Sequence, residues 1–247
     1  MRALFPIVGE RKAALCATEE GGAHPKAIQS QLDHGKITGR KTFVTFGAEA
    51  ELLLVVAREA PGPREALPSG GRSEAESPKE CTLKVALVEA AAPGVTFEPL
   101  PPLPFAPEIG HAQVVLTGAP AEVLPGDGYD LYLKPFRTVE DIHVFGAALA
   151  YLAAAGRRAR WSGDAIAEIG AVVAALATLA ACDPRERETH LVLGGALALG
   201  RALIARADLA GLPDDERARW ERDRPLLGLA EKVRAQRLAG AVSALGL

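Results

Sequence analysis

Cysteine, aromatic residues and net charge are all scarce in this sequence. Its three cysteines, Cys16, Cys81 and Cys182, lie far apart, which fits neither a disulfide framework nor the close ligand pairs of a zinc site. A reducing, cytoplasmic location is therefore expected. The 28 basic and 31 acidic residues nearly cancel and leave a formal charge of -3, so nucleic acid is not an expected partner.

Long apolar runs and common catalytic motifs are also missing. The apolar stretches are rich in alanine and broken by glycine or charge, which predicts a soluble protein with no membrane span. The motifs G-x-S-x-G, His-Glu-x-x-His and Gly-Lys-Ser/Thr do not occur, and the five histidines are scattered, so no metal site is predicted. The composition, 49% hydrophobic and 24% charged, is that of a folded globular chain, and 247 residues favour two domains.

Residues 1–125 have the pattern of a β-domain. Short apolar and β-branched runs alternate with proline and glycine, which predicts a barrel-like sheet. The expected strands are Ala13–Thr18, Ala27–Leu32, Lys36–Thr45, Leu52–Ala57, Thr82–Glu89, Val95–Leu100 and Ala112–Thr117. Asp33-His34-Gly35 suits a tight hairpin connection. Residues 59–80 are rich in proline, glycine, serine and charge, and we expect them to form a mobile surface loop.

Residues 126–247 have helical periodicity instead. Alanine, leucine and arginine dominate, and proline and glycine fall between long segments, which predicts an antiparallel four-helix bundle. The expected helices are Tyr129–Arg158, Asp164–Cys182, Arg187–Asp208 and Pro213–Leu245, with a break in the last one at Pro225. The fold class is therefore α+β, with a β-barrel-like domain followed by a helical bundle.

Three stretches in the β-domain carry the most chemical information: Leu15–His24, Gly35–Thr45 and Ala50–Arg58. The first ends in Thr-Glu-Glu-Gly-Gly, which presents a hydroxyl and backbone donors at a sharp turn. The second contains Phe43-Val44-Thr45, which offers an aromatic face beside another hydroxyl. Such a combination suits a flat heteroaromatic ligand.

These stretches resemble motifs of the acyl-CoA dehydrogenase family. Its middle β-domain opens with A-x-T-E-P-x-A-G-S-D and continues with G-x-K-x-[WF]-I-T and A-D-x-x-x-V-x-A-R strands. The resemblance implies FAD between a β-domain and a four-helix bundle, with an acyl-CoA thioester against the flavin. It places Thr18, Phe43 and Thr45 on the flavin, with nearby backbone from Cys16 and Ala17. A hydroxyl satisfied at a strand end, or a core aromatic ring, is the alternative for these positions.

The helical half of the resemblance supplies substrate and base candidates. Arg137 matches the family's substrate-side arginine, but the residue before it is Phe136, where some members have the catalytic glutamate. Glu140 and Asp141 lie one turn further along and are weak candidates for the base that takes the α-proton. The alternative for both is a solvated helix carboxylate.

An arginine-rich stretch lies at the position where the family binds the FAD of a neighbouring subunit. Arg157 and Arg160 suit a pyrophosphate and Trp161 suits stacking on adenine. The alternative is a basic helix C-terminus followed by a packing tryptophan.

Two departures from the family pattern leave two functions open. About ten residues precede the first motif, so the family's N-terminal helical domain is expected to be missing, and Ala23-His24-Pro25 replaces Gly-Ser-Asp. The first function is that of a truncated flavoprotein with FAD-dependent α,β-dehydrogenation of an acyl-CoA. The second is a catalytically degenerate scaffold that serves as a binding or assembly subunit. Both predict a homo-oligomer or a separate subunit that supplies the missing helices.

Overall fold

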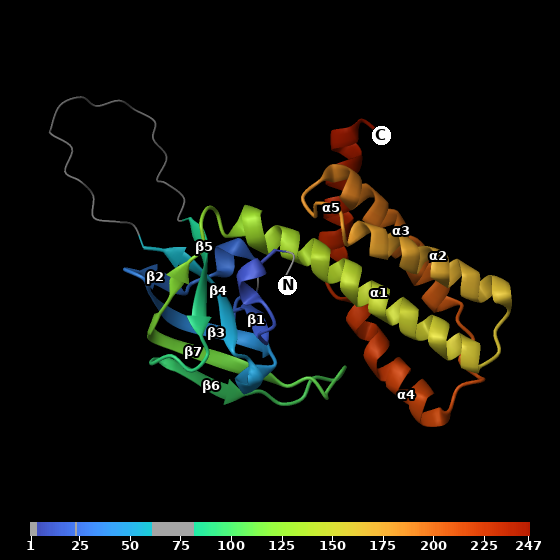
Figure 1. Ribbon diagram of the computed structural model, residues 1–247, viewed down its shortest axis with the longest axis horizontal. Helices are drawn as coiled ribbons and strands as arrows, with labels where there is room; N and C mark the ends of the chain where they lie inside the picture. Colours follow the sequence, from blue (N-terminus) through green and yellow to red (C-terminus); the bar gives the residue numbers. More distant parts are fainter. Residues whose placement is uncertain (1–3, 23, 61–81) are drawn as a thin grey trace. The chain divides into compact units, whose positions relative to one another are not determined.

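The computed structural model describes residues 4–22, 24–60 and 82–247, which divide into two compact units (Figure 1). The β-rich unit extends to Pro102 and resumes over Pro107–Leu133, and the helical unit comprises Leu103–Ala106 and Lys134–Leu247. The division falls at Lys134, not at the predicted residue 126, because residues 126–133 pack with the sheet. Gly128 N–H donates to Leu83 O at 2.7 Å, and the Tyr132 ring stacks on that of Phe5.

Within its described residues, the β-rich unit is built on one mixed sheet of eight strands. Seven of them follow the order β6-β7-β3-β2-β4-β5-β8, and β1 pairs in parallel with β4. The strands are β1 (Ala13–Cys16), β2 (Gln31–Asp33), β3 (Lys36–Thr45), β4 (Leu52–Glu59), β5 (Leu83–Glu89), β6 (Val95–Pro99), β7 (His111–Pro120) and β8 (Glu122–Val123). The predicted loop 59–80 lies, from residue 61 onward, outside the described residues.

The core of this unit centres on β4, whose residues from Leu52 to Ala57 are all buried. The continuous run Leu-Leu-Leu-Val-Val-Ala suits a strand covered on both faces. The predicted strand Ala27–Leu32 is wrong in its first half, because a 3-10 turn occupies Pro25–Ala27 and β2 begins only at Gln31. The hairpin between β2 and β3 is confirmed: His34 and Gly35 have φ of 44° and 72°, as a tight type I′ connection requires.

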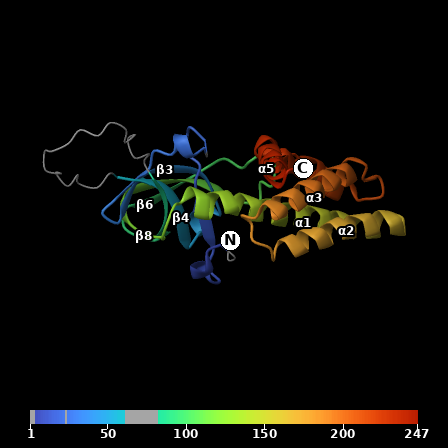
Figure 2. The ribbon, with the colours of Figure 1, turned by 90° about the horizontal axis from the view of Figure 1, so that it is seen from above.

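Five α-helices form the second unit, and Figure 2 shows its long helices running alongside one another. They are α1 (Lys134–Arg158), α2 (Gly163–Leu179), α3 (Arg187–Ala205), α4 (Asp214–Asp223) and α5 (Glu231–Leu245). The predicted break at Pro225 is confirmed, because α4 ends at Asp223 and a 3-10 turn over Arg224–Gly228 precedes α5. Proline lacks the N–H that a continuing helix needs.

Two helical stretches, Tyr129–Arg158 and Arg187–Ala205, are long and apolar enough to cross a membrane by length and composition alone. The sequence-based expectation of no such stretch therefore does not hold. Both helices bury leucines in the core of the helical unit, Leu149 and Leu152 from α1 and Leu193 and Leu197 from α3. Core packing accounts for these buried leucines, because the core of a helical bundle needs apolar side chains.

Candidate functional site

A hollow of about 950 Å³ opens on the β-rich unit, between β3, β7 and the loop that precedes β2. Such a volume lies in the range of small-molecule and cofactor sites. Its lining combines hydroxyl, amide and charged groups with one aromatic ring. These side chains include Glu20, Thr38, Arg40, Thr42, Phe43 and Gln113.

Phe43 reaches this hollow because of a bulge in β3. Lys41 pairs with Val114 and Val44 pairs with Ala112, so Thr42 and Phe43 together stand opposite the single residue between them on β7. The extra residue places Phe43 at a φ of 54°, and its side chain is 52% exposed. A bulky residue in the left-handed region costs about 1–3 kcal/mol, and such strain is typical of functional sites.

Among the described residues that line the hollow, Phe43 is the only member of the predicted flavin set. The Thr45 side chain is exposed at the end of β3, and Thr18 accepts the N–H of Thr42 on its carbonyl at 2.9 Å. Cys16 and Ala17 are buried, and burial raises the pKa of the Cys16 thiol to about 12. Thr42 lines the hollow and was missed, because strict alternation along β3 predicts a different set of outward positions.

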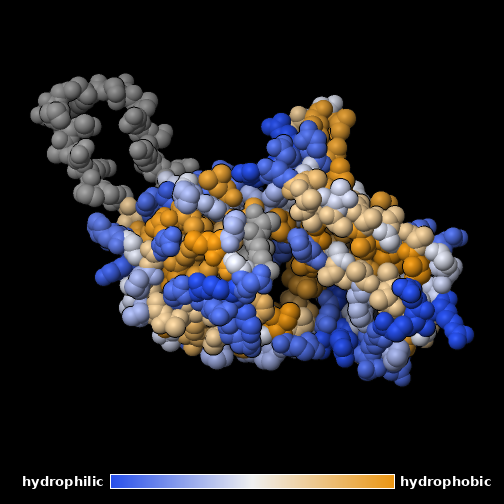
Figure 3. Space-filling model, in the orientation of Figure 1, coloured by the Kyte–Doolittle hydropathy of each residue, from blue (hydrophilic) through white to orange (hydrophobic). Residues whose placement is uncertain are grey.

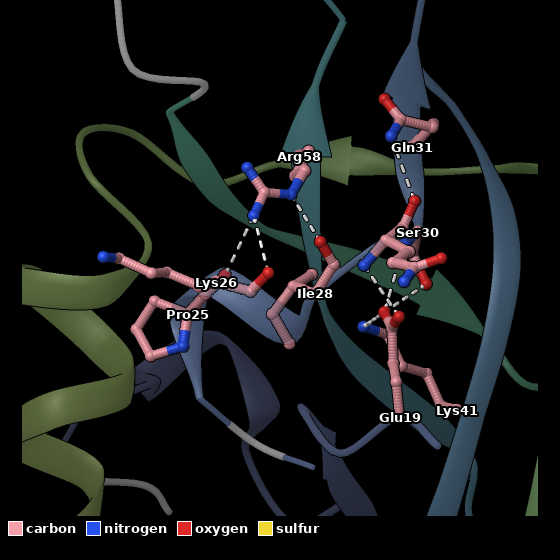
Figure 4. Close-up of polar contacts among 9 residues, drawn as sticks. Glu19, Pro25, Lys26, Ile28, Ser30, Gln31, Lys41 and Arg58 are labelled. Carbon is pink, nitrogen blue, oxygen red and sulfur yellow. Dashed lines mark hydrogen bonds and ion pairs between the residues drawn. The ribbon is translucent and has the colours of Figure 1, made fainter. Parts of the chain in front are cut away.

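A buried ion pair anchors the strand directly before the bulge (Figure 4). Lys41 Nζ lies 2.5 Å from Glu19 Oε1, and the carboxylate also accepts from Ser30 Oγ and N–H and from the Gln29 N–H. Desolvation alone would raise the pKa of Glu19, but Lys41 and these donors outweigh it and lower that pKa. Desolvation lowers the pKa of Lys41, and Glu19 opposes the change. The pair therefore ties β3 to the loop at the hollow.

Arg58 fixes the other end of this loop. Its guanidinium donates to the carbonyls of Ile28, Pro25 and Lys26, the last two at 3.2 Å (Figure 4). His24 caps the 3-10 turn, because its Nδ1 accepts the Lys26 N–H at 3.2 Å. Three residues, Ala23-His24-Pro25, stand in place of the family's Gly-Ser-Asp. Of these, Ala23 lies outside the described residues. The other two residues make a turn that the protein itself stabilises.

In the helical unit, Asp141 is engaged by two arginines of α5. It accepts from Arg234 Nε at 2.8 Å and from Arg237 Nη2 at 2.5 Å, and it is only 6% exposed. Arg234 also lies over the Phe145 ring at 5.0 Å from its centroid. These contacts favour a structural role for Asp141, because both its oxygens serve to hold α5 against α1.

Glu140 differs from its neighbour, because its side chain lies on the exposed side of α1. Partial desolvation raises the pKa of Glu140, and the charge of Asp141 adds to the rise, while Arg137 and Arg234 oppose it. A raised carboxyl pKa suits a general base better than an ordinary one. Of the two base candidates, Glu140 is therefore the one that the geometry leaves available.

Trp161 has a packing role at the junction of α1 and α2. Its indole N–H donates to the Asp208 carbonyl at 2.8 Å, and its ring lies so close to Gly156 that a Cβ there would overlap it. This arrangement favours the packing alternative for Trp161. Arg157 and Arg160 remain exposed, so their predicted phosphate contact stays a prediction.

The described residues contain no group of three His, Cys, Asp or Glu side chains able to hold a metal ion. The hollow beside Phe43 offers one aromatic ring and several hydrogen-bonding groups, a combination that suits an organic ligand.

Neither a family model nor a curated protein matches this sequence. Solved structures do match in fold. An acyl-CoA dehydrogenase from Geobacillus kaustophilus is 17% identical with a TM-score of 0.63, over 96% of this chain and 70% of that one. Butyryl-CoA dehydrogenase from Megasphaera elsdenii is 15% identical with a TM-score of 0.65, over 95% and 68%. PigA with FAD and proline is 15% identical with a TM-score of 0.60, over 98% and 69%. The chain therefore has an acyl-CoA dehydrogenase-like fold, as its motifs predicted.

Proposed function

We propose that this chain is a flavoprotein that binds FAD on its β-rich unit, with the flat ring system of the flavin in the hollow beside Phe43. The observation that carries the proposal is the exposed Phe43 ring. The bulge in β3 directs this ring toward a hollow of about 950 Å³. Thr38, Thr42 and Gln113 offer hydrogen-bonding groups around it. The similarity in fold to a structure that holds FAD supports this assignment.

The local structure fits a bound ring system. Phe43 keeps a strained backbone, and the buried pair of Lys41 and Glu19 anchors the strand next to it. A ligand stacked on Phe43 would cover an aromatic face that otherwise stays in water. Preorganised contacts of this kind reduce the ordering cost of binding.

The reaction proposed for the loaded protein is α,β-dehydrogenation of an acyl-CoA thioester, because two of the structures similar in fold are acyl-CoA dehydrogenases. Bound FAD supplies the hydride acceptor. Glu140 is the proposed base for the α-proton, because its pKa is raised and Asp141 is occupied by arginines. Arg137 is the proposed substrate-side cation.

A catalytically degenerate scaffold that acts as a binding or assembly subunit is the second candidate. The engagement of Asp141 by two arginines favours it, because one of the two base candidates is committed to structure. Bleaching of bound flavin by a panel of acyl-CoA thioesters separates the two functions. Loss of the flavin band supports the dehydrogenase, and an unchanged band supports the scaffold.

Titration of the purified chain with FAD, followed by visible absorption, tests the proposed site. We expect saturable binding of one FAD per chain, and about tenfold weaker binding by Phe43→Ala because a stacking contact is lost. Phe46→Ala is the matched control, since Phe46 is also exposed at a positive φ but does not line the hollow. Absence of binding by the unaltered chain, or an equal loss in the control, contradicts the proposal.

A second copy of this chain is the proposed partner of the helical unit. On α3, Val192 is 51% exposed and Leu199 is 62% exposed, and apolar colour extends over α2 and α3 in Figure 3. The exposed residues of α2 are mostly small: Ala167, Gly170, Ala171, Ala174 and Ala177. Small residues on one copy allow close approach of larger ones from another.

Light scattering during gel filtration is expected to give at least a dimer, and Leu199→Glu should shift the protein toward the monomer. Leu247→Glu is the control. Leu247 is the C-terminal residue and is 76% exposed, and this variant should leave the mass unchanged. If the unaltered chain is monomeric at every concentration, the proposal that a second copy binds the helical unit is wrong.

A further inference from the structure

His190 joins three parts of the helical unit. It is the fourth residue of α3 and is half-buried, and its ring nitrogen Nε2 lies 2.8 Å from the Pro184 carbonyl in the connection between α2 and α3. The same nitrogen lies 3.4 Å from Thr138 Oγ1 on α1, and Thr138 is only 1% exposed. These contacts hold the start of α3 to the connection before it and to α1.

The Pro184 carbonyl determines which nitrogen of the His190 ring carries the hydrogen. A carbonyl oxygen can only accept a hydrogen bond, so Nε2 donates, and Nδ1 of the neutral ring is bare. A proton taken up in acid therefore binds to Nδ1 and gives the ring a positive charge.

A cationic cluster faces the ring from α5. Arg237 Nη1 donates at 3.2 Å to Thr138 Oγ1, the same hydroxyl oxygen that His190 approaches. Arg237 shares the Asp141 carboxylate with Arg234, so these three groups together carry one net positive charge. A protonated His190 would add a second positive charge to a largely buried cluster.

The surroundings of His190 therefore favour its neutral form. Partial burial is the first cause that lowers its pKa, the bond to the Pro184 carbonyl opposes the change, and the charges of Arg237 and Lys134 add to it. The start of a helix also disfavours a cation, because the N-terminal end of the helix dipole is positive.

The other charged groups around this end of α3 do not offset the effect. In the connection before α3, Asp183 is paired with Arg185. The charged residues where α3 begins are exposed: Glu186, Arg187 and Glu188. The charged residues of α2 are Asp164 and Glu168, which lie at its other end, and Glu168 pairs with Arg206 just after α3.

We propose that His190 is a pH switch of the helical unit. Its neutral ring holds the first turn of α3 to the α2–α3 connection and to α1, and protonation in mildly acidic solution releases this contact. Release loosens the junction at which α1, α3 and α5 meet, because Thr138 joins His190 to Arg237.

The direction of the pH dependence follows from the neutral form that the folded state favours. An unfolded histidine takes up its proton near pH 6.5, and His190 in the folded chain takes it up at a lower pH. The stability that His190 contributes is therefore fully present above pH 6.5 and is lost as the pH falls toward the lower folded pKa.

Two measurements on the full chain test the switch. A titration of the histidine rings by nuclear magnetic resonance should show His190 titrating below 6.5. Urea unfolding, followed by the fluorescence of Trp161 and Trp220 in the helical unit, should have a lower midpoint at about pH 5.5 than at about pH 7.5. His190→Gln should lose at least half of this fall in midpoint, because glutamine keeps a neutral donor for the Pro184 carbonyl but takes up no proton.

His143→Gln is the matched control, because His143 is the other histidine of the helical unit. Its side chain lies on the exposed side of α1, and its ring contacts only the Val139 carbonyl of its own helix among the described residues. The control should keep the full fall in midpoint. An equal fall in His190→Gln overturns the proposal. The ring titration needs no variant that must fold, and titration of His190 at or above 6.5 in the unaltered chain overturns the proposal as well.

Discussion

Lys41→Met is expected to lower the free energy of unfolding of the β-rich unit by about 3–5 kcal/mol, because it leaves the Glu19 carboxylate buried without its cation. Lys41 is fully buried and Glu19 is 8% exposed, so water can do little to replace the lost charge. Hydrogen exchange of peptides from β3 and β4, measured at increasing urea, reports the stability of this unit.

Two variants give this experiment its controls. Lys36→Met changes an exposed lysine on the same strand and should alter stability by less than about 0.5 kcal/mol. Glu19→Gln/Lys41→Met removes both charges and should recover most of the loss. If Lys41→Met were as stable as the unaltered chain, the Glu19–Lys41 pair would make no net contribution to the stability of the β-rich unit.

The pH dependence of the same unit follows from the lowered pKa of Glu19. Its carboxylate contributes stability that is fully present above the unfolded pKa, near 4.5, and is lost as the pH falls through the lower folded pKa. Acidification below that range should therefore weaken the unaltered β-rich unit more than the double variant.

Asp141→Asn is expected to destabilise the helical unit by about 3–5 kcal/mol, because two largely buried guanidinium groups lose their shared carboxylate. Side chains of Arg234 and Arg237 are only 10% and 13% exposed. The two tryptophans of the chain, Trp161 and Trp220, both belong to this unit, so fluorescence during urea unfolding reports its stability.

Glu140→Gln is the matched control at the next residue. Its effect on stability should be small, because the side chain is exposed and its raised pKa means that ionisation does not favour the folded state. If acyl-CoA bleaches the flavin of the unaltered chain, Glu140→Gln should abolish that bleaching. An Asp141→Asn variant that keeps full stability but loses bleaching would reverse the roles assigned to the two carboxylates.

The regular elements could be predicted well from sequence because their signals are local. The bounds of β3 match the prediction, and the break between α4 and α5 follows from Pro225. The hairpin turn at His34-Gly35 follows from residues adjacent in sequence.

Features that depend on pairing between distant residues could not be predicted. Alternation along β3 gives no sign that Thr42 and Phe43 share one place opposite β7. Asp141 looks like a solvated helix carboxylate because its partner Arg234 is 93 residues away. Lys41 likewise has the sequence character of a surface lysine until the loop folds Glu19 over it.

The two buried ion pairs differ in the length of chain that each closes. Glu19 and Lys41 are separated by 22 residues, and Asp141 and Arg234 by 93. Because loop-closure entropy grows with the logarithm of loop length, the contact in the helical unit costs about 1 kcal/mol more chain entropy than the contact beside the hollow. On this entropy alone, a refolding chain can gather the groups around the bulge of β3 sooner than it can bring α5 back onto α1.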